Sequence, residues 1–133
     1  MSLKINLTAS IMILFIIVAM MSVPHGCSID WSADLRLTTH EDIDWFPSVT
    51  ATADGKVWVV WRSDRTDVNG DIFYKVFNGS SWTEDTQLTW DAHEDDYPCV
   101  TQTSDGKIWV VWVSDRIEQN ENLFYKVFDG VSW

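Results

Sequence analysis

Two arginines stand where they could bind a carboxylate, Arg65 and Arg116, each after the dipeptide Ser-Asp. An arginine guanidinium can hold a carboxylate through two parallel hydrogen bonds, as a site for an acidic sugar requires. Both arginines, however, occupy the same position of an internal repeat, beside Asp64 and Asp115. A side chain that recurs in every repeat favours a structural role, because one active site needs its residues only once. We therefore predict that each arginine pairs with the adjacent aspartate or caps its loop, and we assign no catalytic residue.

Two acidic clusters are the next candidates, Glu41/Asp42/Asp44 and Glu94/Asp95/Asp96. A glycosidase needs two carboxylates at a defined separation across a sugar, and Ca²⁺ prefers several carboxylate and carbonyl oxygens. Residues 67–71 faintly resemble a calcium loop, but the second copy does not keep that pattern of acids. We predict solvated acidic turns and no cofactor, with Ca²⁺ the one candidate that these loops leave open.

Histidines and charge exclude further classes of site. His40 and His93 each precede Glu-Asp but lie two positions apart in the repeat alignment, and neither has a second histidine or a cysteine nearby. This is a poor zinc pattern, so we predict no metal site. The net charge of −11 also makes nucleic acid an unsuitable partner, because binding DNA or RNA needs clustered Lys and Arg.

Nine tryptophans suggest a surface for sugars or proteins. Trp45 and Trp90 fall in predicted loops and align with Asp96 and Thr39, so the repeat does not require them. We therefore choose these two as candidate ligand-binding residues. The repeated tryptophans are assigned to structure, in the inter-sheet core or over a hairpin exit: Trp58, Trp61, Trp82, Trp109, Trp112 and Trp133.

The elements that position these residues come from a duplication. The segment Asp54–Arg65 returns as Asp105–Arg116, and residues 31–81 match residues 82–132 at 27 of 51 positions without a gap. A period of this length indicates tandem supersecondary units that stack on one another. Asp64, Arg65, Asp115 and Arg116 are therefore treated as structural repeat positions.

Each repeat predicts four short antiparallel strands and no helix. In the first copy we place them at 48–53, 57–61, 71–77 and 82–89, separated by an Asp-Gly turn, a polar loop at 63–70 and an Asn-Gly hairpin. The second copy repeats them at 99–104, 108–112 and 122–128, with a polar loop at 114–121. Residues 57–61 are apolar on both faces of a strand, so both faces must be covered.

Turn glycines complete the structural positions. Gly55, Gly79, Gly106 and Gly130 follow Asp or Asn, and we predict a positive φ at each. Substitution of Gly55 is expected to be more harmful than substitution of Gly70.

The predicted fold class is all-β: two tandem four-stranded blades of a β-propeller after an N-terminal signal or anchor segment. Residues 29–38 are assigned to the outer strand of a preceding blade. Blade one spans 47–89, and blade two spans 98–133 and lacks most of its outer strand.

The order Leu37-Thr38, Asp54-Gly55-Lys56, Ser63-Asp64-Arg65 and Asn69-Gly70-Asp71-Ile72 resembles the WD-repeat-like propeller repeat of TolB-type proteins. The segment Phe128–Trp133 is similar to the Asp-box hairpin of sialidase-type propellers, although Phe77 and Phe128 replace the acidic residue of that box. The 51-residue unit is also longer than a TolB-type blade. The resemblance implies the fold, since propellers carry many unrelated activities.

Residues 1–28 predict export. Lys4 precedes an unbroken apolar run of eleven residues, Ile11–Met21, which suits a signal peptide better than a membrane span of about 20 residues. Cleavage before Ile29, lipidation at Cys27 and an uncleaved anchor at 5–23 remain open, and each places the rest of the chain outside the cytoplasm. Cys99 is expected to be a buried free thiol, with a disulfide to Cys27 as the alternative.

We expect an exported, non-catalytic repeat protein that is secreted or membrane-anchored at the cell surface, where it binds a protein or a glycan. A sialidase-like glycoside hydrolase, or a fragment of one, and a TolB-like envelope scaffold are the alternatives. Because closed propellers use about 4–8 blades, further blades are expected from a longer chain or from self-association.

Overall fold

The computed structural model describes residues 32–66 and 68–133, which form seven β-strands and no helix. Within these residues there is consequently no helix that could cross a membrane. The predicted signal or anchor segment and Cys27 lie outside the described residues. Residues 32–38 are described and form no strand, although we expected an outer strand at 29–38.

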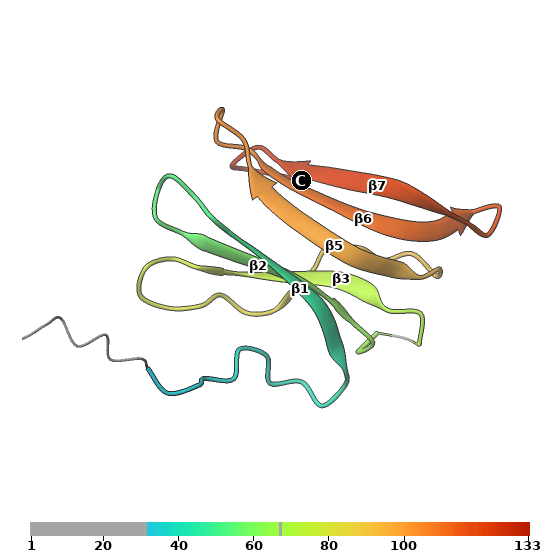
Figure 1. The fold of residues 1–133 in the computed structure, drawn as a ribbon, viewed down its shortest axis with the longest axis horizontal. Helices are drawn as coiled ribbons and strands as arrows, with labels where there is room; N and C mark the ends of the chain where they lie inside the picture. Colours follow the sequence, from blue (N-terminus) through green and yellow to red (C-terminus); the bar gives the residue numbers. More distant parts are fainter. Residues whose placement is uncertain (1–31, 67) are drawn as a thin grey trace, which may run out of the picture. The chain divides into compact units, whose positions relative to one another are not determined.

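The strands make two antiparallel sheets, which we call sheet A and sheet B (Figure 1). Sheet A has the order β1-β2-β3-β4, and its strands are β1 (Asp44–Ala51), β2 (Val57–Ser63), β3 (Asp71–Phe77) and β4 (Thr86–Gln87). Sheet B has the order β5-β6-β7, and its strands are β5 (Asp95–Gln102), β6 (Ile108–Ile117) and β7 (Asn120–Phe128). The all-β class and the antiparallel order are confirmed.

The duplication extends to the strand register. Trp58 pairs with Val76 in sheet A, and Trp109 pairs with Val127 in sheet B, so the pairs differ by the repeat length of 51. A residue of one sheet and the residue 51 positions later are therefore structural counterparts, and we use the word in this sense below.

The first strand of each sheet begins earlier than predicted, inside the acidic segment. The register of β1 shifts between Trp45 and Ser48, and Phe46 there has a φ of 50°. Tyr97 has a φ of 52° at the same place in β5. A bulge of this kind accommodates a proline, which cannot donate a hydrogen bond to the ladder. Pro47 and Pro98 are consequently inside their strands, and Trp45 belongs to a strand and not to a loop.

The outer part of sheet A is shorter than the predicted strand 82–89. Only β4 is regular, and Trp82 adds a single bridge to Phe77. Two threonine hydroxyls accept the backbone hydrogen bonds that a longer strand would take: Thr89 from the Ile72 amide and Thr83 from the Val76 amide. Side chains thus replace part of the ladder, which a strand pattern does not reveal.

In sheet B the predicted polar loop 114–121 is mostly strand. β6 continues to Ile117 and β7 begins at Asn120, so Glu118 and Gln119 alone form the turn. Both have a positive φ, 53° and 56°, as a two-residue hairpin with the favoured twist requires.

The main core lies between the two sheets. Sheet A contributes Trp58, Val60, Ile72 and Val76, and sheet B contributes Val100, Ile108, Val110 and Trp112; Leu88, from the segment between them, completes the buried cluster. Nine buried apolar side chains of this kind supply most of the hydrophobic stabilisation of such a small unit.

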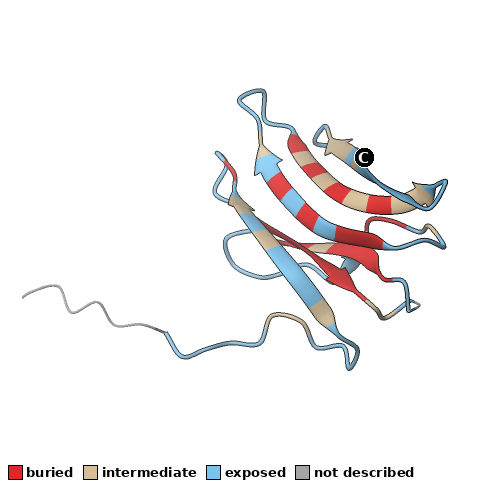
Figure 2. Cartoon of the chain, turned by 45° about the vertical axis from the view of Figure 1, so that its right-hand side comes forward, coloured by how far each residue is buried: buried red, intermediate tan, exposed pale blue. Residues whose placement is uncertain are grey.

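Each sheet also has an outer face. The outer face of sheet A carries a smaller buried cluster, Val59, Trp61 and Phe73, packed against Leu37 and Val57. The outer face of sheet B is formed by the pairs Trp109/Val127, Val111/Tyr125 and Val113/Leu123. It is far more accessible, since Leu123 is 75% and Tyr125 63% exposed. Figure 2 shows β6 buried at alternate residues and β7 exposed over much of its length.

Trp109 is therefore not the buried core residue that we predicted. Trp58 points into the space between the sheets and is 7% exposed, whereas its counterpart Trp109 lies on the outer face of sheet B and is only half-buried. Cys99 also differs from the expectation, because its free thiol is exposed.

We predict that Trp58→Ala lowers the free energy of unfolding by roughly 3–5 kcal/mol, because it opens a cavity in the main core. Trp109→Ala should lower it by less than half as much, since that side chain is partly in water already. Urea unfolding of the two variants measures both values. Equal losses would contradict the assignment of the two faces.

The turn glycines behave as predicted: φ is 82° at Gly55, 98° at Gly79, 84° at Gly106 and 103° at Gly130. Gly70, however, also has a positive φ of 74°, and a Cβ there would overlap the guanidinium of Arg62 and lie 2.9 Å from Asp64 Oδ1. A Cβ at Gly55 would meet nothing within 4 Å. The expected order of sensitivity is thus reversed.

We predict that Gly55→Ala costs about 1–2 kcal/mol of stability, the ordinary cost of a left-handed alanine. Gly70→Ala should cost more, because the buried Arg62 must also move. Thermal unfolding of the two variants side by side tests the order, which would be wrong if Gly55→Ala proved the more damaging.

Candidate functional site

Arg65 lies in a closed network of polar contacts just after β2. Its Nε donates to Ser63 Oγ (2.8 Å), one terminal nitrogen to Asp85 Oδ2 (2.8 Å) and the other to Asp44 Oδ1 (3.2 Å). Lys75 Nζ lies 2.6 Å from the second oxygen of Asp85. The carboxylate-binding geometry of this arginine is thus already used within the chain.

Arg116 repeats the arrangement in sheet B. It reaches both oxygens of Asp95, at 2.6 and 2.8 Å, and donates to Ser114 Oγ at 2.9 Å. Its guanidinium carbon lies 4.5 Å from the centre of the Phe124 ring, as that of Arg65 lies 4.5 Å from the centre of the Phe73 ring. Charge pairing and stacking together hold both side chains in place.

The partners of the arginines differ from those we predicted. Adjacent residues of an extended chain point to opposite sides, whereas residues two apart share a side. Asp64 therefore contacts Arg62 (3.1 Å), two positions before it, and Arg65 contacts Ser63. Asp115 accepts a hydrogen bond from the Glu94 amide (3.1 Å). The aspartates that pair with Arg65 and Arg116 at the shortest distances lie about twenty positions away in the chain.

Arg62 is a residue that the sequence reasoning missed. It is buried, and its guanidinium extends from sheet A to Glu94 (3.3 Å), just before β5, and to Asp96 (4.0 Å) in β5 of sheet B. A buried cation of this kind depends on its carboxylates, because an unpaired charge is costly away from water. The signal was present, since the counterpart of Arg62 is Val113 and the position breaks the repeat.

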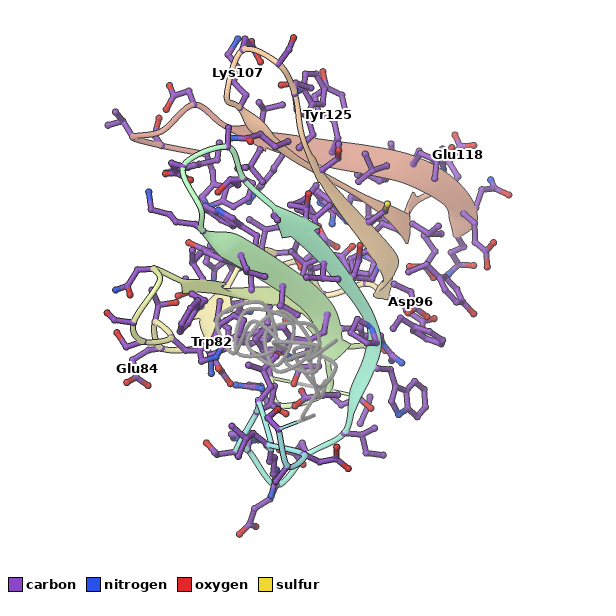
Figure 3. The ribbon with its side chains drawn as sticks, turned by 60° about the vertical axis from the view of Figure 1, so that its left-hand side comes forward. Trp82, Glu84, Asp96, Lys107, Glu118 and Tyr125 are labelled. Carbon is purple, nitrogen blue, oxygen red and sulfur yellow. The ribbon has the colours of Figure 1, made fainter. Side chains whose placement is uncertain are left out.

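The acidic clusters form no metal centre in the described part of the chain, and they are not the solvated turns that we predicted, because Asp95 and Asp96 are buried at the start of β5. No group of three acidic, histidine or cysteine side chains is placed there to hold an ion. His40 contacts Asp42 (3.1 Å) and His93 contacts Asp91 (2.7 Å), each pair being exposed and local. Figure 3 labels Asp96, which lies at the start of sheet B beside the groups that engage Arg62.

Trp45 borders an apolar cleft on the outer face of sheet A. The cleft has a volume of about 250 Å³ and is lined by Leu37, Thr38, Asp44, Trp45, Pro47, Val59 and Trp61. Trp45 is 44% exposed, and the Arg62 guanidinium carbon lies 5.0 Å from its ring centre. This aromatic surface could hold an apolar side chain.

Trp90 is not part of that cleft. It is 69% exposed in the segment between β4 and β5, where Lys126 Nζ lies 4.9 Å from its ring centre. The structure thus places the two candidate tryptophans at different positions, and no single ligand site contains both. Trp82 packs on Phe77 (5.4 Å between ring centres) and Trp133 on Phe128 (5.5 Å), each beside its hairpin.

The Arg65 network should make stability depend on pH. Burial alone raises the pKa of Asp85, but hydrogen bonds and positive charge from Lys75 and Arg65 outweigh it and hold the pKa below the ordinary value of 3.8. Burial likewise raises the pKa of Asp44, and hydrogen bonds from Thr38, Ser63 and Arg65 more than offset it. Both carboxylates therefore stabilise the folded state in their charged form.

We predict that Asp85→Asn lowers the free energy of unfolding by about 3 kcal/mol at neutral pH, because Arg65 and Lys75 lose a buried partner. A depressed carboxyl pKa stabilises the fold above the unfolded value and ceases to do so as the pH falls through the folded value. The difference between variant and wild type should consequently shrink below the ordinary pKa of 3.8. Urea unfolding across this range measures it, with the neighbouring exposed Glu84→Gln as control. A difference that stays constant with pH would contradict the role of the network.

The comparisons with known proteins give the fold and no activity. No protein-family model matches the sequence, and no curated protein matches it. The structure is similar to a crystal structure of a protein of unknown function from Dyadobacter fermentans DSM 18053, with a TM-score of 0.55 and 16% sequence identity. The similarity covers 71% of this chain and 36% of that one, so this chain spans about a third of that protein. At this identity the likeness extends to the arrangement of strands.

Proposed function

We propose that this chain is an exported, non-catalytic β-propeller-type protein whose two sheets are consecutive blades, and that it works as an interaction module at the cell surface. The four-stranded order of sheet A, the stacking of sheet B on it and the 51-residue period support the propeller type. The apolar run at 11–21 supports export.

The outer face of sheet B carries the proposal. Leu123 and Tyr125 are exposed there beside half-buried Trp109, Val111 and Val113. A continuous apolar sheet face on the surface is typical of a site that binds another protein. Sugars are bound through polar groups around one or two rings, whereas the three cross-strand pairs of β6 and β7 that form this face consist of aliphatic or aromatic side chains. The face therefore favours a protein partner over a glycan.

The arginines support a non-catalytic role, because their side chains are already paired. Arg65 and Arg116, the groups with the chemistry to hold an acidic substrate, are both engaged by aspartates of the chain. Freeing either guanidinium for a substrate would leave buried aspartates without their partner. A binding role leaves these networks intact.

We predict that the full chain retains envelope proteins of the producing organism and that Leu123→Lys reduces this retention at least tenfold, because a charge in the centre of an apolar contact costs more than about 1.4 kcal/mol. Val68→Lys is the matched control. It makes the same change at a valine that is 88% exposed in the loop between β2 and β3, and it should bind as wild type does.

The enzyme alternative has a distinct outcome. The full chain should release no chromophore from a chromogenic sialoside. Turnover that disappears in Arg65→Ala but persists in Leu123→Lys would overturn the proposal in favour of a hydrolase.

A further inference from the structure

The outer face of sheet B is the counterpart of the sheet A face that sheet B covers. Trp58 and Tyr74 stack in sheet A with their ring centres 5.5 Å apart, and Trp109 and Tyr125 stack in sheet B at 5.2 Å. The apolar type is kept at five counterpart positions: Trp58/Trp109, Val60/Val111, Ile72/Leu123, Tyr74/Tyr125 and Val76/Val127. One of these faces is buried in the chain, and the other is exposed.

The outer face of sheet A is, in the same way, the counterpart of the sheet B face that is buried. Val59 and Trp61 correspond to Val110 and Trp112, which are 0% and 3% exposed between the sheets. Leu37 takes the place of Leu88 as well: its carbonyl accepts from Lys75 Nζ (3.1 Å), as that of Leu88 accepts from Lys126 Nζ (2.6 Å). The cleft beside Trp45 is thus the open form of a surface that sheet A fills in the next repeat.

At the margin of the contact between sheets A and B, the residues of both sheets differ in type from their counterparts. Arg62 of sheet A meets Glu94, just before β5, and Asp96, in β5 of sheet B. The counterpart of Arg62 is Val113, on the outer face of sheet B. The counterparts of the two acids are Ile43, just before β1, and Trp45, near the start of β1, and they are 53% and 44% exposed.

A change on one side alone would place a charge against an apolar surface and leave it unpaired. At the outer surfaces both sides have changed together: the counterparts of the base and of the two acids are all apolar. They are complementary to each other as the inner faces are, but by a different chemistry.

Aromatic side chains give a further match. Trp133 meets Trp58 and Tyr74 at 5.9 and 5.4 Å between ring centres, and its Nε1 lies 3.3 Å from the Tyr74 hydroxyl. Its counterpart is Trp82, which is 40% exposed beside sheet A. In Figure 3 Tyr125 is seen on sheet B and Trp82 beside sheet A, so each half of a second such contact is on the surface.

We propose that the partner of the outer face of sheet B is the outer face of sheet A of a second copy of this chain. This inference names the partner of the proposed interaction module and rests on that function. Stacked as sheets A and B are stacked, the copies bring Val113 of one against Ile43 and Trp45 of the next, and Trp82 of the next against the Trp109–Tyr125 stack. The contact joins unlike faces, so it continues from copy to copy until the series closes into a ring or extends as a filament.

The test restores charged residues at the counterparts of Arg62 and of its acidic partner Glu94, in two full-length variants. Val113→Arg introduces the base at one face, and Ile43→Glu, at the counterpart of Glu94, introduces an acid at the other. Each variant alone meets a wild-type face on its neighbour and should raise the apparent Kd of self-association at least about tenfold, because a charged group is then desolvated against an apolar side chain of the neighbouring copy. An equimolar mixture should associate again, since the guanidinium introduced at position 113 of one variant then meets the carboxylate introduced at position 43 of the other, and the remaining wild-type faces match.

Sedimentation velocity over a range of concentrations gives the association, and unfolding curves show that each variant is folded. Val68→Arg is the matched control and should associate as wild type does. The N-terminal apolar run is present in every protein, so any association that it causes is the same in all.

The inference is overturned if wild type stays monomeric, if either variant associates as well as wild type does, or if the mixture remains dissociated. Should wild type be monomeric while Leu123→Lys still loses its envelope partner, the interaction module stands and a second copy is not its partner. If wild type neither self-associates nor retains an envelope protein, the proposed interaction module is overturned as well.

Discussion

The structure depends on one constraint: its central strands are apolar on both faces. In β2, Trp58 and Val60 alternate with Val59 and Trp61, and all four are buried. A single two-layer contact covers only one face of such a strand, so the other face needs a cover of its own, which Leu37 supplies in part for sheet A. Stacking of repeated sheets in one direction covers these faces. Each added sheet, however, again presents an uncovered apolar face at the end of the stack. The distribution of buried and exposed side chains follows from this.

The same constraint explains how far the sequence could predict the fold. The strand class, the antiparallel order and the positive φ at the turn glycines follow from local patterns and were predicted from the repeat. Trp58 and Trp109 have almost the same local sequence and different exposure, because exposure depends on the neighbouring sheet and not on the strand. The shortened β4 and the bulges at Phe46 and Tyr97 were missed for a related reason. Threonine hydroxyls and prolines alter the hydrogen-bond ladder without changing the hydrophobic pattern.

Prediction of the charged groups failed where it assumed that neighbours in sequence are neighbours in space. The extended backbone points Asp64 and Arg65 to opposite sides, and the true partners, Asp44 and Asp85, come from different segments of the fold. Repetition nevertheless separated the two kinds of arginine. Arg65 and Arg116 recur and stabilise each sheet internally, whereas Arg62 occurs once and connects the two sheets. A position that breaks the repeat thus indicates a contact that differs between neighbouring sheets.

Net charge and apolar faces act together on the surface. A chain with a net charge of −11 repels its copies at distances within about 10 Å at moderate ionic strength, and this repulsion opposes weak contacts between exposed strand edges. Burial of apolar surface stabilises a contact by about 25 cal/mol per Å². A contact that buries a whole sheet face can therefore outweigh the repulsion, whereas a small or misaligned contact cannot. Acidic residues 41, 42 and 44 lie before and at the start of β1, next in sequence to the apolar residues Ile43 and Trp45. In the proposed self-association, the charges of Glu41 and Asp42 limit which surfaces approach, and the apolar pair provides the stabilisation once the matching face is in register. On that proposal, the acidic composition confers specificity on an apolar contact that would otherwise be indiscriminate.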